Sequence, residues 1–324
     1  MLLDWARLAG VLSRSRDLHA APDPRCHVQR NVPTVNGWVA DRFLPKTPSG
    51  AASLLVHGWT LRGKDDLRLQ ALARALAIAG VECLVPRVPG LATLSWEVAD
   101  VAGIRALLEA ERVPPAVVGF SFGGSYSLLA ASGCAKQPRF VVSVSGHADL
   151  PALFRYWETW GAKAPDGAEA RKSWIYQKLA LAWRQRDALA IPETGQTQLR
   201  EILLSFCDEG SADAAWSFYE QALRATNWEA ENRLRQEPAV LHALSPAEHP
   251  PRLGCPVLIL HDKTDQAVPA SEAKIMAEAI ARGSPTISVD LLVTDLLRHV
   301  SLGPAFRLGE VARLVRLLSP LVRG

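Results

Sequence analysis

The stretch VVGFSFGGSY, residues 117–126, places Ser121 between glycines two positions away on either side. A strand-like run, PAVVGF (115–120), precedes the serine, and a helix-like run, FGGSYSLLAAS (122–132), follows it. A reversal from strand to helix at one residue strains its backbone and brings neighbouring chains close, which suits glycine because it has no Cβ. The stretch therefore predicts an exposed serine hydroxyl beside the free N–H groups of a helix.

Short apolar runs alternate with amphipathic patterns over much of the chain. Strands are predicted at 37–45, 52–57, 81–86, 115–120, 139–146, 254–262 and 286–294. Helices are predicted at 65–80, 95–111, 122–132, 271–283 and 306–317. This alternation predicts an α/β fold with a mostly parallel central sheet and helices on both of its faces.

Residues 148–252 interrupt the alternation. They contain helical patterns, no convincing strand and six of the ten tryptophans. We expect an all-helical cap inserted after the strand that follows the serine helix. The core would then comprise residues 1–147, with an N-terminal helical segment over 1–25, and residues 253–324.

Composition limits the possible classes of function. About half of the residues are apolar (48%), 21% are charged and the formal net charge is only +3. These values predict a soluble globular protein with a substantial core, and the scattered Lys and Arg give no support to nucleic-acid binding. The five cysteines form no CxxC pair and have no metal-ligand spacing, so we expect no metal and no cofactor.

The N-terminus is apolar enough to raise the question of a signal peptide. Asp4 and Arg7 interrupt the apolar run, and no basic region precedes it. No stretch approaches the roughly 20 uncharged apolar residues of a membrane span. We therefore expect a cytoplasmic protein with no membrane span.

Three further stretches accompany the serine turn. They are LLVHGWT (54–60), VLILHDKTDQAVP (257–269) and LLRHVSLGP (296–304). Together with the turn they resemble the α/β-hydrolase superfamily over roughly residues 35–147 and 253–320. The chain order Ser…Asp…His, with the acid after one late strand and the histidine after the next, is the order of that superfamily.

The resemblance implies a role for each residue. Ser121 is expected to be the nucleophile and His299 the base that activates it and then protonates the leaving group. Asp265 is expected to hold the imidazole in the correct tautomer. The backbone N–H groups of Trp59 and Phe122 are expected to form the oxyanion hole.

The acid has two rivals. The pair Val268-Pro269 favours Asp265, because it matches the pattern that follows the acid in the α/β-hydrolase superfamily. Asp262 lies in the same loop, where the family more often has a small residue. Asp149 follows the preceding strand, where some members place the acid.

Other polar and aromatic residues have two interpretations each. His57 is expected to orient its loop, and a place in the substrate pocket is its other interpretation. His147 is expected either to line the pocket or to cap a neighbouring element. Arg87 binds either a substrate anion or, as we favour, a buried carboxylate. Trp157 and Trp160 of the insertion are candidates for an apolar pocket wall.

The sequence thus predicts a serine hydrolase that cleaves carboxylic esters of small or medium, hydrophobic substrates. The same three residues would serve an acyltransferase, a thioesterase, an amidase or peptidase, or a C–C hydrolase. A ligand receptor with little turnover is the alternative from another class. A small molecule is the expected partner, and the sequence does not fix the oligomeric state.

Overall fold

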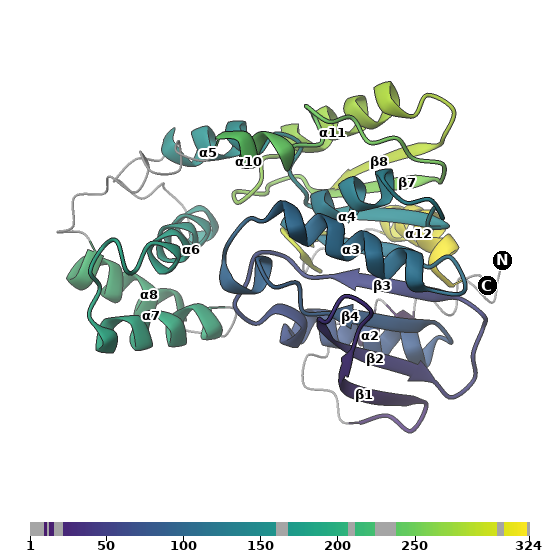
Figure 1. Ribbon diagram of the computed structural model, residues 1–324, viewed down its shortest axis with the longest axis horizontal. Helices are drawn as coiled ribbons and strands as arrows, with labels where there is room; N and C mark the ends of the chain where they lie inside the picture. The colour runs from purple at the N-terminus through teal and green to yellow at the C-terminus, as the bar shows by residue number, and fades with distance from the viewer. Residues whose placement is uncertain are drawn as a thin grey trace.

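The computed structural model describes residues 10–11, 13–15, 22–159, 168–206, 211–223, 238–302 and 308–322. One sheet and the helices that cover it form the core of the described structure (Figure 1). None of the described helices is long and apolar enough to cross a lipid bilayer. The expected helical segment over 1–25 lies largely outside the described residues.

The described strands form one eight-stranded sheet in the order β1-β2-β4-β3-β5-β6-β7-β8. Their bounds are β1 Cys26–Pro33, β2 Val39–Pro45, β3 Ala52–Val56, β4 Glu82–Pro86, β5 Ala116–Phe120, β6 Phe140–Val144, β7 Val257–Asp262 and β8 Val289–Thr294. Strands β3 to β8 run parallel, whereas β2 is antiparallel to both β1 and β4. The mostly parallel sheet predicted from the alternation is confirmed.

Strand β1 was not predicted from the sequence. It is an edge strand with no neighbour other than β2 in the described sheet, and most of its side chains are exposed or half-buried. The register shifts between Gln29 and Val32, and Asn31 has a φ of 53°. Such a bulged edge strand lacks the apolar alternation by which sequence analysis recognises strands.

Helices cover both faces of the sheet. On one face lie α2 (Leu67–Ile78) and α12 (Leu308–Leu318); on the other lie α3 (Val98–Ala110), α4 (Phe122–Ser132) and α11 (Ala270–Gly283). Short turns of 3₁₀ helix occur at Gly63–Asp65, Leu91–Thr93 and Ser319–Val322, and a two-residue hairpin pairs β9 (Leu297–Arg298) with β10 (Ser301–Leu302). The Asp66 side chain accepts the N–H of Arg68 and so caps α2.

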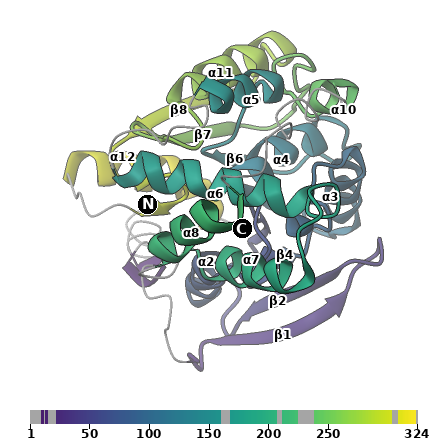
Figure 2. The same cartoon turned by 90° about the vertical axis from the view of Figure 1, so that its left-hand side faces the viewer.

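The described residues between 148 and 252 form helices joined by turns and contain no strand. The helices are α5 (Leu150–Thr159), α6 (Ala168–Arg184), α7 (Glu193–Ser205), α8 (Ser211–Phe218) and α10 (Pro238–Ala243), with a π-helical turn at Tyr219–Leu223. We call this segment the helical insertion. Figures 1 and 2 show α6, α7 and α8 grouped in front of one end of the sheet, the end where the parallel strands finish.

The helical insertion shares a hydrophobic core with the α3–α4 face of the sheet. One buried cluster runs from Ile104 of α3 and Tyr126 of α4 to Trp174 of α6 and Leu199 of α7. Trp96 of the core contacts Phe154 of α5 with ring centroids 5.1 Å apart. Burial of this apolar surface holds the insertion against the strand ends, where parallel sheets gather their ligands.

Candidate active site

Ser121 occupies a strained turn between β5 and α4. Its φ of 51° and ψ of −125° lie outside the ordinary regions for a non-glycine residue, a conformation that costs about 1–3 kcal/mol. Two backbone hydrogen bonds hold it there: the Ser121 N–H donates to Val144 O at 2.8 Å, and its carbonyl accepts the N–H of Gly124 at 2.8 Å. The sharp strand-to-helix turn inferred from the quoted stretch is present.

The flanking glycines are required by close approach of the backbone. A Cβ on Gly119 would lie 2.2 Å from the carbonyl oxygen of Gly123, and a Cβ on Gly123 would lie 2.3 Å from that of His57. The loop after β3 also lies against the serine, because a Cβ on Gly58 would be 3.2 Å from the Cβ of Ser121. Side chains at these positions would force the turn apart.

The loop after β3 and the start of α4 place two N–H groups near Ser121. Phe122 is the first residue of α4, so its N–H has no partner within the helix. In the part of the chain that the structure describes, the Trp59 N–H makes no backbone hydrogen bond either. The Trp59 ring stacks on that of Phe122 with centroids 5.5 Å apart, and its carbonyl accepts the hydroxyl of Tyr176 at 2.7 Å. These contacts fix both residues beside the serine.

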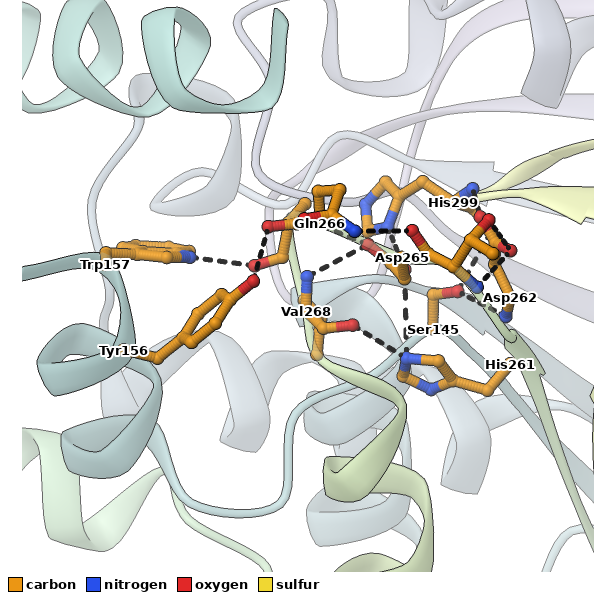
Figure 3. A network of polar contacts seen from close by, with 11 residues as sticks. Ser145, Tyr156, Trp157, His261, Asp262, Asp265, Gln266, Val268 and His299 are labelled. Atoms are coloured by element: carbon orange, nitrogen blue, oxygen red, sulfur yellow. Dashed lines mark hydrogen bonds and ion pairs between the residues drawn. The ribbon is translucent and has the colours of Figure 1, made fainter. Parts of the chain in front are cut away.

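Asp265 and His299 form a close pair (Figure 3). His299 Nδ1 lies 2.6 Å from Asp265 Oδ2, and the aspartate side chain is fully buried. The other oxygen, Oδ1, accepts the N–H groups of Ala267 and Val268 at 2.8 and 3.0 Å. Burial alone would raise the pKa of Asp265, but the charge of His299 and these hydrogen bonds outweigh it and lower the pKa. The group is therefore a carboxylate at neutral pH.

The protonation pattern of His299 follows from this contact. A carboxylate can only accept, so Nδ1 carries a hydrogen, and in the neutral imidazole Nε2 then presents a lone pair. Ser121 and His299 line the same cavity. No hydrogen bond joins their side chains among the described residues, and such contacts are often long before substrate binds.

The two rival acids have other contacts. Asp149 Oδ1 accepts the N–H of Ala152 at 2.8 Å, so it caps the first turn of α5. Asp262 reaches His299 only through the backbone, where its Oδ2 accepts the His299 N–H at 2.8 Å. Of the three candidates, Asp265 is the one that bonds to the imidazole.

His57 holds its own loop. Its Nε2 accepts the N–H of Val88 at 3.0 Å, so the hydrogen is on Nδ1, which donates to Gly58 O at 2.7 Å. Burial lowers the pKa of His57 to about 4, so the ring is neutral. His57 lines the cavity, and its contacts agree with the loop-orienting role expected from the sequence.

His147 lies behind the site instead of in it. Its ring packs on Phe122 with centroids 4.8 Å apart, and Nε2 bonds to Leu244 O at 3.1 Å. Burial lowers its pKa to about 4. His147 is not among the residues that line the cavity, so of its two expected roles the structure favours the structural one.

Ser121 lines a mainly apolar cavity of about 820 Å³, which extends from the helical insertion to α2 and α12. The core contributes Trp59 and Phe122 near the serine, and the helical insertion contributes Trp157 of α5, Tyr176 of α6 and Phe206 after α7. Of the two tryptophans named as candidates for a pocket wall, Trp157 lines this cavity, whereas Trp160 lies outside the described residues. A pocket with these walls suits an apolar group on the substrate.

Arg87 departs from expectation. Its guanidinium approaches the carbonyl oxygens of Arg62 and Ala92, both at 3.5 Å. Within the described ranges it has no carboxylate partner, so the buried ion pair that we favoured is not found there. Among these residues there is also no group of three or more His, Cys, Asp or Glu side chains that could hold a metal ion.

Comparison with known proteins identifies the family. A model of the alpha/beta hydrolase family matches residues 54–294, well over half of the chain. The chain belongs to the alpha/beta hydrolase family. No curated protein sequence matches it significantly.

Solved structures agree with this alpha/beta hydrolase fold. An esterase of Pyrococcus furiosus aligns with a TM-score of 0.52 at 12% identity, over 95% of this chain and 93% of that one. An esterase of the bacterial hormone-sensitive lipase family aligns with a TM-score of 0.51 at 17% identity, over 98% of this chain and 97% of that one. The acylaminoacyl peptidase of Pyrococcus horikoshii aligns with a TM-score of 0.50 at 11% identity, over 92% of this chain and 42% of the peptidase chain. At these identities the likeness concerns the fold alone.

The sequence analysis did not assign a supporting role to three residues near the site of this alpha/beta hydrolase. Tyr176 supports the loop of Trp59, Ser145 bonds to the main chain of His299, and Asp262 was considered only as an acid. All three act through backbone atoms far away in the sequence. No local pattern signals such contacts.

Buried neutral histidines make the stability of this alpha/beta hydrolase depend on pH. Burial lowers the pKa of His57 and His147 from 6.5 to about 4 and also lowers that of His261. Between pH 6.5 and about pH 4 these histidines bind more protons in the unfolded chain than in the folded one, so the free energy of unfolding falls as the pH drops through this range. At pH 5 the loss is about 2 kcal/mol for each of His57 and His147.

We expect the His147→Gln variant to lose about 2 kcal/mol less stability than the wild type between pH 7 and pH 5. Urea unfolding at the two pH values measures the difference. Asp100, whose pKa burial raises to about 6, opposes the histidines, so the comparison must be made between variants and not from one curve. An identical pH dependence in both proteins would show that His147 is not buried in its neutral form.

Proposed function

We propose that this protein is a serine hydrolase that cleaves carboxylic esters of small or medium, hydrophobic substrates through an acyl-enzyme on Ser121. The observation that carries the proposal is the 2.6 Å contact between His299 Nδ1 and Asp265 Oδ2, in the same cavity as a strained serine turn. A metal-free acyl transfer needs a nucleophile, a base and a group that orients the base, and these residues supply all three.

Each step of the reaction has a residue to perform it. His299 Nε2 takes the proton of Ser121 as Oγ attacks the ester carbonyl carbon. The N–H groups of Trp59 and Phe122 stabilise the resulting oxyanion, each donor being worth about 3 kcal/mol in the transition state. His299 then protonates the leaving alcohol. Water activated by the same imidazole releases the acid and restores Ser121.

The carboxylate of Asp265 serves the proton transfers. It stabilises the imidazolium that forms when His299 accepts the serine proton, and it fixes the tautomer that leaves Nε2 free. Because Asp265 also accepts two backbone N–H groups, its own orientation is fixed before substrate arrives. The fold of the two esterases and the peptidase named above is compatible with this chemistry on esters or amides.

The walls of the cavity limit the substrate. The helical insertion covers the strand ends and places Trp157, Tyr176 and Phe206 around the opening above Ser121. Aromatic walls favour apolar or aromatic acyl groups, and a covered serine excludes folded proteins. We propose that the insertion acts as a cap that selects soluble substrates by size.

A panel of p-nitrophenyl esters with increasing acyl length tests this proposal. We expect kcat/KM for short, medium or aromatic acyl groups to exceed that for emulsified long-chain triglyceride by at least about 10-fold, the scale of discrimination that an apolar pocket gives. A fluorophosphonate probe should label the wild type at one site. Absence of labelling and of turnover would favour the receptor alternative, and higher activity on emulsified lipid would contradict the size limit.

A further inference from the structure

The main chain of His299 is held from both sides by buried side chains. Its N–H donates to Asp262 Oδ2 at 2.8 Å, and its carbonyl accepts the Ser145 hydroxyl at 2.9 Å (Figure 3). Asp262 is 2% exposed and Ser145 is fully buried. The backbone of His299 is therefore held by two side chains from other strand ends, those of β7 and β6.

His299 needs such support because its conformation is unfavourable. Its φ is 51°, in the left-handed region that favours glycine. A non-glycine residue stays in this region only when its surroundings determine its position. The bonds to Asp262 and Ser145 meet this requirement, since they fix the peptide groups on both sides of the Cα that carries the imidazole.

Asp262 also organises the loop that carries Asp265. Its Oδ1 accepts the N–H of Thr264 at 2.9 Å and the Thr264 hydroxyl at 3.1 Å. One carboxylate thus binds the residue that precedes the proposed acid and the backbone of the proposed base. The distance between Asp265 and His299 depends on both loops, and Asp262 connects them.

We propose that Asp262 and Ser145 are positioning residues that keep the imidazole of His299 on Asp265 and directed at Ser121. The proposal rests on the proposed function. Neither residue lines the cavity, so neither contacts substrate. Ser145 acts on the reaction through the backbone of His299, and Asp262 acts through that backbone and through the loop that carries Asp265.

The test compares Asp262→Ala and Ser145→Ala with the wild type on a soluble p-nitrophenyl ester. We expect kcat per fluorophosphonate-titrated site to fall about 10- to 100-fold, the range seen when a supporting contact is lost and a catalytic group shifts. KM should change much less, because the cavity walls are intact. Ser145→Ala keeps the Cβ, so it removes the hydroxyl without altering the φ preference at a residue whose own φ is 49°.

A second readout is independent of turnover. The Nδ1 hydrogen shared by His299 and Asp265 should give a low-field proton resonance in the wild type, assigned by its loss in His299→Gln. We expect this resonance to weaken in both alanine variants. Asp262→Asn should have intermediate activity, because one amide oxygen can accept the His299 N–H but cannot also accept from Thr264.

Ser284→Ala is the matched control. The Ser284 hydroxyl accepts the N–H of Leu253 at 2.6 Å and donates to Pro251 O at 2.8 Å, so it also joins two loops. It is 5% exposed and contacts residues that precede β7, at the end of the sheet away from the site. We expect Ser284→Ala to lower stability while leaving kcat per titrated site and the low-field resonance unchanged.

The outcomes separate this proposal from the proposed function. Wild-type kcat and an intact resonance in folded Asp262→Ala and Ser145→Ala would overturn the positioning role, and so would an equal loss of kcat in Ser284→Ala. A wild-type protein that neither turns over esters nor accepts the probe would instead overturn the proposed function. In that case the resonance alone still decides whether Asp262 and Ser145 hold His299 on Asp265.

Discussion

Ser121→Ala is expected to lower kcat for ester hydrolysis by about 10⁴-fold or more, with almost no effect on the fold. The serine hydroxyl is the nucleophile of the first step of the proposed reaction, and without it no acyl-enzyme can form. The fold survives because the backbone bonds of Ser121 to Val144 and Gly124 do not involve the hydroxyl. We expect the melting temperature to change by about 2 °C or less.

Kinetics with the most reactive ester of the panel and thermal unfolding by circular dichroism measure these two effects. Ser132→Ala is the matched control, since Ser132 ends the same helix and its hydroxyl accepts the N–H of Arg252 at 2.8 Å. That variant should retain wild-type kcat and labelling. A folded Ser121→Ala protein with near-wild-type hydrolysis would exclude the acyl-enzyme mechanism.

The serine turn could be predicted from ten residues because its cause is local. Gly119 and Gly123 are required by backbone atoms within a few residues of Ser121 or at the end of the adjacent strand. The candidate positions for the acid and the base came from the resemblance to the α/β-hydrolase superfamily, and in the fold they lie at one edge because parallel strands bring their carboxyl ends together. The alternation of strands and helices predicted the mostly parallel sheet, and a short motif predicted the serine turn.

From the sequence, the preference for Asp265 among three aspartates rested only on the Val268-Pro269 pair that follows it. Asp149, Asp262 and Asp265 all follow strands whose ends meet at the same edge, and only side-chain direction separates them. Asp149 turns back to cap a helix, Asp262 bonds to backbone and Asp265 bonds to the imidazole. These directions depend on loop conformations that are fixed by contacts over long sequence separations.

The contacts that the helical insertion makes with the core also could not be predicted from the sequence. Its amphipathic helices required an apolar partner, but periodicity does not say which wall of the cavity each helix forms. The hydroxyl of Tyr176 on Trp59 O and the indole N–H of Trp157 on Ala267 O connect the insertion to the loops of the oxyanion donor and the acid. Each of these bonds joins one side-chain atom to a backbone group far away in the sequence, so it produces no periodic pattern of residues.

Asp265→Asn is expected to lower kcat about 10³- to 10⁴-fold while the protein stays folded, as substitutions that impose the wrong tautomer do. The reason lies in the two roles of the carboxylate. Oδ1 accepts N–H groups of Ala267 and Val268, so the amide oxygen introduced at position 265 will keep that place and the NH₂ group will face His299. Nδ1 must then accept, the hydrogen moves to Nε2, and Nε2 can no longer take the proton of Ser121.

Asp149→Asn is the matched control for this substitution. Asp149 caps α5 through Oδ1, and asparagine caps a helix as well as aspartate does, so kcat and stability should both remain near wild type. Steady-state kinetics and urea unfolding of the two variants, side by side, give the comparison. If Asp149→Asn lost activity by orders of magnitude and Asp265→Asn were nearly silent, the acid would be Asp149, and the 2.6 Å contact of His299 with Asp265 would be structural. The expected asymmetry follows because only one of the two carboxylates sets which imidazole nitrogen carries the hydrogen.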